Sequence, residues 1–86
     1  MGNEKKEHVR EALFEAIQNQ IRDKNPKETK VTLDRLVREG HTHDEAMRLI
    51  AFALVNELND MLKANRPFNE VRYVKALKAL PKLPRE

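Results

Sequence analysis

The sequence contains no cysteine, no serine and no tryptophan among its 86 residues. The absence of cysteine excludes disulfide bonds, thiolate nucleophiles and cysteine metal ligands. Without serine, the only side-chain hydroxyl groups belong to Thr29, Thr32, Thr42 and Tyr73. Covalent catalysis therefore has few residues to draw on, and we expect a protein without enzymatic activity and without a cofactor.

Long apolar runs are also missing. No stretch of about 18 apolar residues occurs, and no charged, apolar and small-residue leader opens the chain. Neither a membrane span nor a signal peptide is expected, and we interpret the chain as cytoplasmic. Its length allows one domain, residues 1–86, with short flexible ends at 1–3 and 82–86.

The net charge is small but unevenly distributed. The formal charge of +3 arises mainly in residues 65–86, where six basic and two acidic residues give +4. A net charge of this size bears on solubility, whereas its concentration near the C-terminus is compatible with a polyanion contact.

Apolar residues recur at helical spacing along most of the chain, and no segment alternates as a strand would. The pattern predicts an all-α fold, a compact bundle of four helices at about residues 4–22, 26–39, 43–64 and 70–80. The third helix is predicted to be central, because its length of about 33 Å crosses the whole domain. The residues predicted to face the core are Val9, Leu13, Ala16, Ile17, Ile21, Val31, Leu33, Leu36, Val37, Ala46, Met47, Ile50, Ala51, Leu54, Leu58, Met61, Leu62, Tyr73, Val74, Leu77 and Leu80.

Several helix boundaries carry recognisable signals. Pro26 suits the first turn of the second helix, and Gly40 stands where a left-handed C-terminal cap would follow that helix. Thr42 precedes Glu45 by three residues, which predicts a capping box at the start of the third helix. Asn69 is predicted to cap the fourth helix.

Three segments carry a family resemblance: NPKETKVTLDRLVREG (25–40), EAMRLIAFALVNEL (45–58) and RPFNEVRYVKALKALPKLP (66–84). From roughly Leu13 to Pro84 the pattern resembles an uncharacterised family of short all-helical bacterial proteins, a domain of unknown function. The resemblance implies a self-contained helical unit and no particular activity, so no catalytic residue is carried over. The sequence His41-Thr42-His43 differs from the acidic or serine-rich turn of that family. The resemblance therefore implies no metal-binding role shared with the family at these residues.

His41 and His43 are weak candidates for metal ligands. Zinc needs three or four ligands, and the sequence offers no evident third one near this pair. The H-x-H spacing also differs from the i, i+4 pairing that places two imidazoles on one helical face. We favour a helix-capping turn that happens to contain histidines.

Glu57 is predicted to be a buried polar residue, because it falls among apolar residues of the third helix. A structural partner such as an arginine, a backbone N–H or the Tyr73 hydroxyl would satisfy its carboxylate, and Gln20 is a candidate neighbour. Without a partner, desolvation would raise its pKa and make it a candidate acid or base. We favour the structural pairing.

Two surfaces are candidates for binding. Leu49, Phe52 and Val55 lie off the main apolar face of the third helix, which predicts a contact with another helix or with a second subunit. The other is a stripe of cations that could contact a polyanion, formed by Arg72, Lys75, Lys78 and Lys82.

From these patterns we predict a non-enzymatic protein interaction or self-association module, with a protein partner or a second copy in a homodimer. The first alternative is weak nucleic-acid binding by the basic fourth helix, and the second is metal binding by residues 41–45.

Overall fold

The computed structural model describes the backbone of residues 2–84 and the side chains of residues 8–84. This part of the chain folds into α1 (Gly2–Asp23), α2 (Lys27–Arg38), α3 (His43–Ala64) and α4 (Glu70–Ala79), with no strand among the described residues. The predicted all-α fold of four helices is confirmed, and each predicted helix end lies within two residues of the observed one. Of the ends predicted to be flexible, residues 1, 85 and 86 lie outside the described residues.

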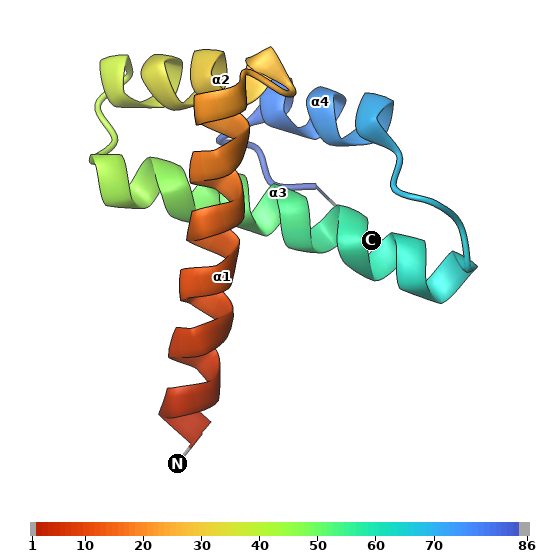
Figure 1. Cartoon of the computed structure of the whole chain (residues 1–86). Helices are drawn as coiled ribbons and strands as arrows, with labels where there is room; N and C mark the ends of the chain where they lie inside the picture. The colour runs from red at the N-terminus through yellow and green to blue at the C-terminus, as the bar shows by residue number, and fades with distance from the viewer. Residues whose placement is uncertain (1, 85–86) are drawn as a thin grey trace.

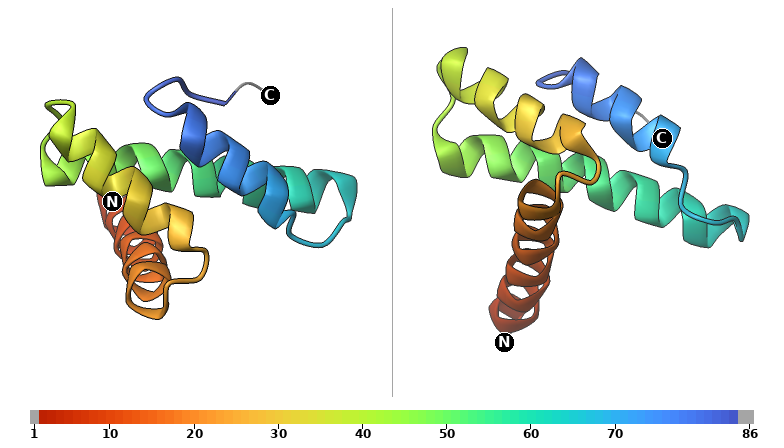
Figure 2. Two further views of the ribbon diagram at one scale, coloured as in Figure 1. Left: turned by 90° about the horizontal axis from the view of Figure 1, so that it is seen from above. Right: turned by 45° about the horizontal axis from the view of Figure 1, so that its top comes forward.

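The helices pack around α2 and α3, each of which contacts all three others. Figure 1 shows α2 and α4 along one side of α3, whereas α1 crosses α3 at a steep angle. The backbones of α1 and α4 do not approach one another. The further views in Figure 2 show the N-terminal part of α1 extending away from the other helices. This extension fits a radius of gyration of 12.8 Å, slightly above the roughly 12 Å typical of a compact chain of this length.

The core lies between the inner faces of all four helices. Its buried apolar residues are Ile17, Leu33, Leu36, Ala46, Met47, Ile50, Ala51, Ala53, Leu54, Tyr73, Leu77 and Leu80. Burying one of the larger of these side chains, a leucine, isoleucine or methionine, stabilises the fold by about 1.5–3 kcal/mol. Six of the twelve come from α3, in keeping with its predicted central position.

Four residues predicted to face the core are exposed: Val9, Val31, Val37 and Leu62. Val9 lies in the N-terminal half of α1, and it is 57% exposed. Leu62 lies near the end of α3, and it is 73% exposed. In α2 the buried face consists of Thr29, Thr32, Leu33 and Leu36, so the two valines lie off that face.

Three helices end with the same hydrogen-bonded turn. At the ends of α1, α2 and α3 a backbone N–H donates across a left-handed residue to a carbonyl five residues back, at 3.0 Å in each case: Asn25 to Gln20, His41 to Leu36 and Arg66 to Met61. The left-handed residues are Lys24, Gly40 and Asn65, with φ angles of 54°, 110° and 53°. The prediction for Gly40 is confirmed. Lys24 is the least suited of the three, because a side chain disfavours this conformation unless it is short and polar.

We expect opposite effects from exchanging glycine at these turns. Lys24→Gly should raise the free energy of unfolding by about 0.5–1 kcal/mol, and Gly40→Ala should lower it by about 1–2 kcal/mol, because only the first removes strain from the left-handed region. A Cβ at Gly40 would meet no atom within 4 Å, so its effect is purely conformational. Urea unfolding measures both changes. Lys30→Gly, within α2, is the control and should destabilise; the same loss in Lys24→Gly would contradict the assignment.

Candidate functional site

Glu57 occupies the inner side of α3, where it is 4% exposed. Its Oε2 accepts a hydrogen bond from the backbone N–H of Asn69 at 3.2 Å, and its Oε1 lies 3.3 Å from Nε of Arg72. Asn69 in turn caps α4 through its own side chain, which accepts from the backbone N–H of Arg72 at 3.0 Å. The buried carboxylate therefore ties the middle of α3 to the first turn of α4.

The charged cluster continues outward from Glu57 to the surface. Asp60 Oδ2 accepts from a terminal guanidinium nitrogen of Arg66 at 2.6 Å and also pairs with Arg72. The hydrogen bond from Arg72 lowers the pKa of Asp60 from its ordinary value, with a smaller contribution from Arg66, and the same bond to Asp60 raises the pKa of Arg72. Two acids and two arginines thus neutralise one another at the junction of α3 and α4.

A second polar network lies inside the domain. The Gln20 side-chain oxygen accepts hydrogen bonds from the Thr29 hydroxyl and from the Tyr73 hydroxyl, each at 2.8 Å. These bonds join α1, α2 and α4 at a single atom. Gln20 was predicted as a candidate neighbour of Glu57, but its side-chain oxygen instead accepts hydrogen bonds from Thr29 and Tyr73. Burial raises the pKa of Tyr73, so that its hydroxyl keeps the proton it donates.

The histidine corner is a capping structure. The Thr42 hydroxyl accepts from the Glu45 N–H at 3.0 Å, and the Glu45 carboxylate accepts from the Thr42 N–H at 2.8 Å, which confirms the predicted capping box. His41 closes the turn after α2, and His43 is the exposed first residue of α3. Within the side chains described, at residues 8–84, no three histidine, aspartate or glutamate residues gather as a metal site would require.

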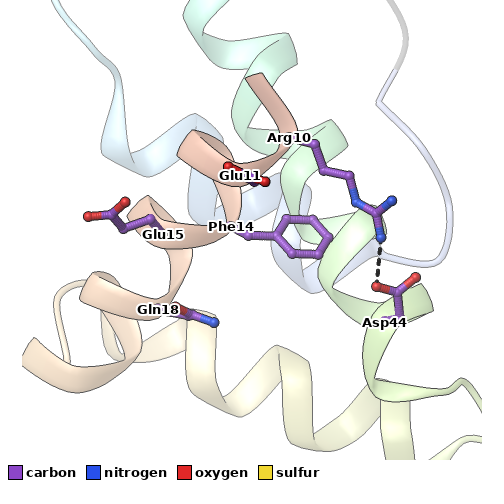
Figure 3. Close-up of a pocket in the computed structure, with 6 residues that line it drawn as sticks. All are labelled: Arg10, Glu11, Phe14, Glu15, Gln18 and Asp44. Atoms are coloured by element: carbon purple, nitrogen blue, oxygen red, sulfur yellow. Dashed lines mark hydrogen bonds and ion pairs between the residues drawn. The ribbon is translucent and has the colours of Figure 1, made fainter. Parts of the chain in front are cut away.

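Close to this corner, α1 meets the first turn of α3. Figure 3 shows Arg10 beside the ring of Phe14, with its guanidinium directed at Asp44, while Glu15 points away from it. Arg10 lies 2.9 Å from Asp44 and 5.1 Å from the centre of the Phe14 ring, and Arg48 pairs with the other Asp44 oxygen at 2.9 Å. The depression around these side chains is open to solvent, and the paired charged groups are about half exposed or more. Their ion pairs therefore contribute little to stability.

A more apolar groove lies on the outer side of α3. Phe52 is 48% exposed, and the two other interface candidates, Leu49 and Val55, are half-buried. Leu49 and Phe52 line a groove of about 370 Å³ together with Pro81 and Leu83 from the segment after α4. Sequence reasoning missed the last two, because Leu83 lies in the end predicted to be flexible, 82–86, and Pro81 lies just beyond the predicted fourth helix. We call Leu49, Phe52, Val55, Pro81 and Leu83 the Phe52 surface.

The predicted basic stripe divides into two parts. Lys75, Lys78 and Lys82 are exposed. Arg72 is held by Glu57 and Asp60, so its charge is already partnered within the domain. Three lysines therefore remain as the cationic groups that this stripe presents to solvent.

Comparison with models of known protein families, with curated proteins and with solved structures found no match to this chain. The family resemblance of residues 13–84 accordingly stays a prediction. None of the helices in residues 2–84 combines the length and the hydropathy needed to cross a membrane.

Removing the buried Glu57 carboxylate should lower the free energy of unfolding more than neutralising its charge does. We expect Glu57→Ala to lower the free energy of unfolding by about 2–3 kcal/mol, because the Asn69 N–H loses its acceptor and the Arg72 charge loses its inner partner. Glu57→Gln keeps an oxygen for Asn69 and should lose less. Urea unfolding gives both values, with the more exposed Asp60→Asn as control. Equal small losses in all three variants would contradict the role given to Glu57.

The capping box should make stability depend on pH. The hydrogen bond from the Thr42 N–H holds the pKa of Glu45 below its ordinary value of 4.5. The contribution of the Glu45 carboxylate to stability is therefore complete above that value and is lost as pH falls through the lower pKa of the folded state. We expect the stability difference between the wild type and Glu45→Gln to shrink between pH 6 and pH 3. Glu15→Gln, outside any cap, is the control whose difference should change less.

Proposed function

We propose that this protein is a non-enzymatic interaction module of the cytoplasm that binds a protein partner, or a second copy of itself, through the Phe52 surface. The observation that carries this proposal is a half-exposed phenylalanine set in an apolar groove. Aromatic side chains are enriched at protein interfaces, where burying one supplies much of the binding energy.

The groove has features of a contact site formed before binding. Leu49 packs against the core from one side, which fixes the floor of the groove. The chain after α4 is held by Leu80, which is fully buried, so that Pro81 and Leu83 stand beside α3. A surface held in place in this way loses little conformational entropy on binding.

The polar groups of the interior support a structural role. Glu57, Gln20, Thr29 and Tyr73 are buried or half-buried, and each is hydrogen-bonded to another element of the fold. Their hydrogen bonds link the helices to one another, whereas a catalytic group would need to be free to reach a substrate. This use of the polar side chains favours binding over chemistry.

Nucleic-acid binding by Lys75, Lys78 and Lys82 is the alternative function. Its support is weaker, because Arg72 is engaged by two carboxylates and the flanking helix surface supplies Glu28 and Glu70. Binding that falls steeply with rising salt would favour it. For metal binding by residues 41–45, the capping box already engages Thr42 and Glu45, and Asp44 pairs with Arg10 and Arg48.

The proposal predicts that a charge at position 52 abolishes binding without unfolding the domain. Phe52→Asp should leave the helical circular dichroism spectrum and the melting temperature within a few degrees of the wild type, because the side chain is half in solvent. We expect Phe52→Asp to weaken binding affinity by at least tenfold. The affinity is that of self-association, measured by sedimentation equilibrium, or that of a purified partner protein that the wild type binds.

The matched control is Val31→Asp. Val31 is 61% exposed and lies on α2, outside the Phe52 surface, and Lys27 one turn before it compensates a new acid. This variant should bind as the wild type does. Equal losses in both variants, or binding by Phe52→Asp at wild-type affinity, would show that the Phe52 surface is not the contact. Unfolding of Phe52→Asp would place Phe52 in the core.

A further inference from the structure

The segment after α4, residues 81–84, reverses direction and lies against α3 and α4 (Figures 1 and 2). On one side Pro81 and Leu83 line the groove of the Phe52 surface. On the other side Pro84 lines a second depression of about 330 Å³, whose walls include the buried Glu57. The same four residues therefore border both the apolar groove and the depression over the Glu57 carboxylate.

Few interactions hold this segment in place. Among the described residues, its backbone donates a single hydrogen bond, from the Lys82 N–H to the Ala79 carbonyl oxygen at 3.0 Å. Pro81 and Pro84 have no N–H to donate. Three of the four residues are exposed, and Pro84 is half-buried. The anchor of the segment is the residue before it, Leu80, which is fully buried.

The surface on which the segment lies is made of small side chains. Ala76 and Ala79 of α4 line a further depression of about 470 Å³ together with Lys82, Leu83 and Pro84. The segment therefore spans open space between itself and α4, and alanine side chains offer little apolar area for it to bury. An element with few buried contacts and few hydrogen bonds opens at a lower free energy than the whole domain unfolds.

The residues of α3 beside this segment are buried, in contrast to the segment itself. Ala53 is 1% exposed and Glu57 is 4% exposed, and both line the depression that Pro84 borders. The apolar core extends as far as Leu80 and includes none of residues 81–84. Movement of the segment away from α3 would therefore expose this side of α3 and leave the core intact.

We propose that residues 81–84 form a strap that opens and closes over α3 while the four helices stay folded, and that only the closed strap completes the Phe52 surface. When the strap opens, the groove loses the wall formed by Pro81 and Leu83. A partner that contacts this wall binds the closed state and holds the strap shut. This control of binding rests on the proposed function, because it concerns the same surface, whereas the opening itself does not.

Thiol labelling measures the opening, because the natural chain has no cysteine and each variant carries a single thiol. Ala53→Cys places the thiol beside the strap, and Ala46→Cys is the matched control at an equally buried position of the same helix. Without denaturant, DTNB should react with the Ala53→Cys protein at least about tenfold faster, because strap opening exposes this thiol alone. Low urea concentrations should raise only the Ala46→Cys rate, because global unfolding exposes far more surface than strap opening does.

Weakening the strap gives the second readout. Leu83→Gly removes the one large aliphatic side chain of residues 81–84, so it should raise the Ala53→Cys rate severalfold and leave the Ala46→Cys rate unchanged. Urea unfolding of each variant shows that the four helices remain folded in the labelling conditions.

Two results would overturn the proposal. Equal rates in Ala53→Cys and Ala46→Cys, with the same dependence on urea, would show that the strap opens only when the whole domain unfolds. A fast Ala53→Cys rate that Leu83→Gly leaves unchanged would place the opening in another element. Neither result bears on the proposed function, which Phe52→Asp decides separately through the loss of binding.

Discussion

The carboxylate of Glu57 is the constraint from which much of the arrangement follows. A buried charge is costly unless opposite charge and hydrogen-bond donors reach it, so α4 must begin where the Asn69 N–H and the Arg72 guanidinium meet α3. With the start of α4 fixed, Tyr73 enters the core in its first turn and reaches Gln20 of α1. One acid in α3 thereby determines a contact between two helices whose backbones do not meet.

The far end of α4 is fixed by another charged residue. Arg35 of α2 donates to the carbonyl oxygen of Leu77 at 3.1 Å, where the C-terminal end of a helix favours a cation. Held at both ends, α4 delivers Leu80 to the core, and the chain that follows passes beside α3. The groove around Phe52 is thus a consequence of how the polar residues position α4.

The sequence predicts the local features of this fold well and its long-range features poorly. The Thr42 capping box, the Asn69 cap and the turn at Gly40 depend on residues a few positions apart, and all three are confirmed. The burial of Thr29 and Thr32 and the exposure of Val31 depend on which helix covers each face, which periodicity does not specify. Likewise, the helical pattern places Gln20 on an apolar face without indicating that Thr29 and Tyr73 share its oxygen. Pro81 and Leu83 were missed because their place beside Phe52 is set by α4, not by their own pattern.

The steep crossing of α1 explains why a domain this small leaves an aromatic side chain in solvent. Helices that pack nearly parallel cover one another along their whole length, whereas a steeply crossing pair is in contact only near the crossing point. α1 meets α3 at its first turn, through Arg10 and Asp44, and then extends past it (Figure 1). Among the described residues, no helix covers Phe52 and Leu62 on the outer side of α3, and Val9 of α1 is exposed for the same reason. This uncovered side carries Phe52, on which the proposed contact depends.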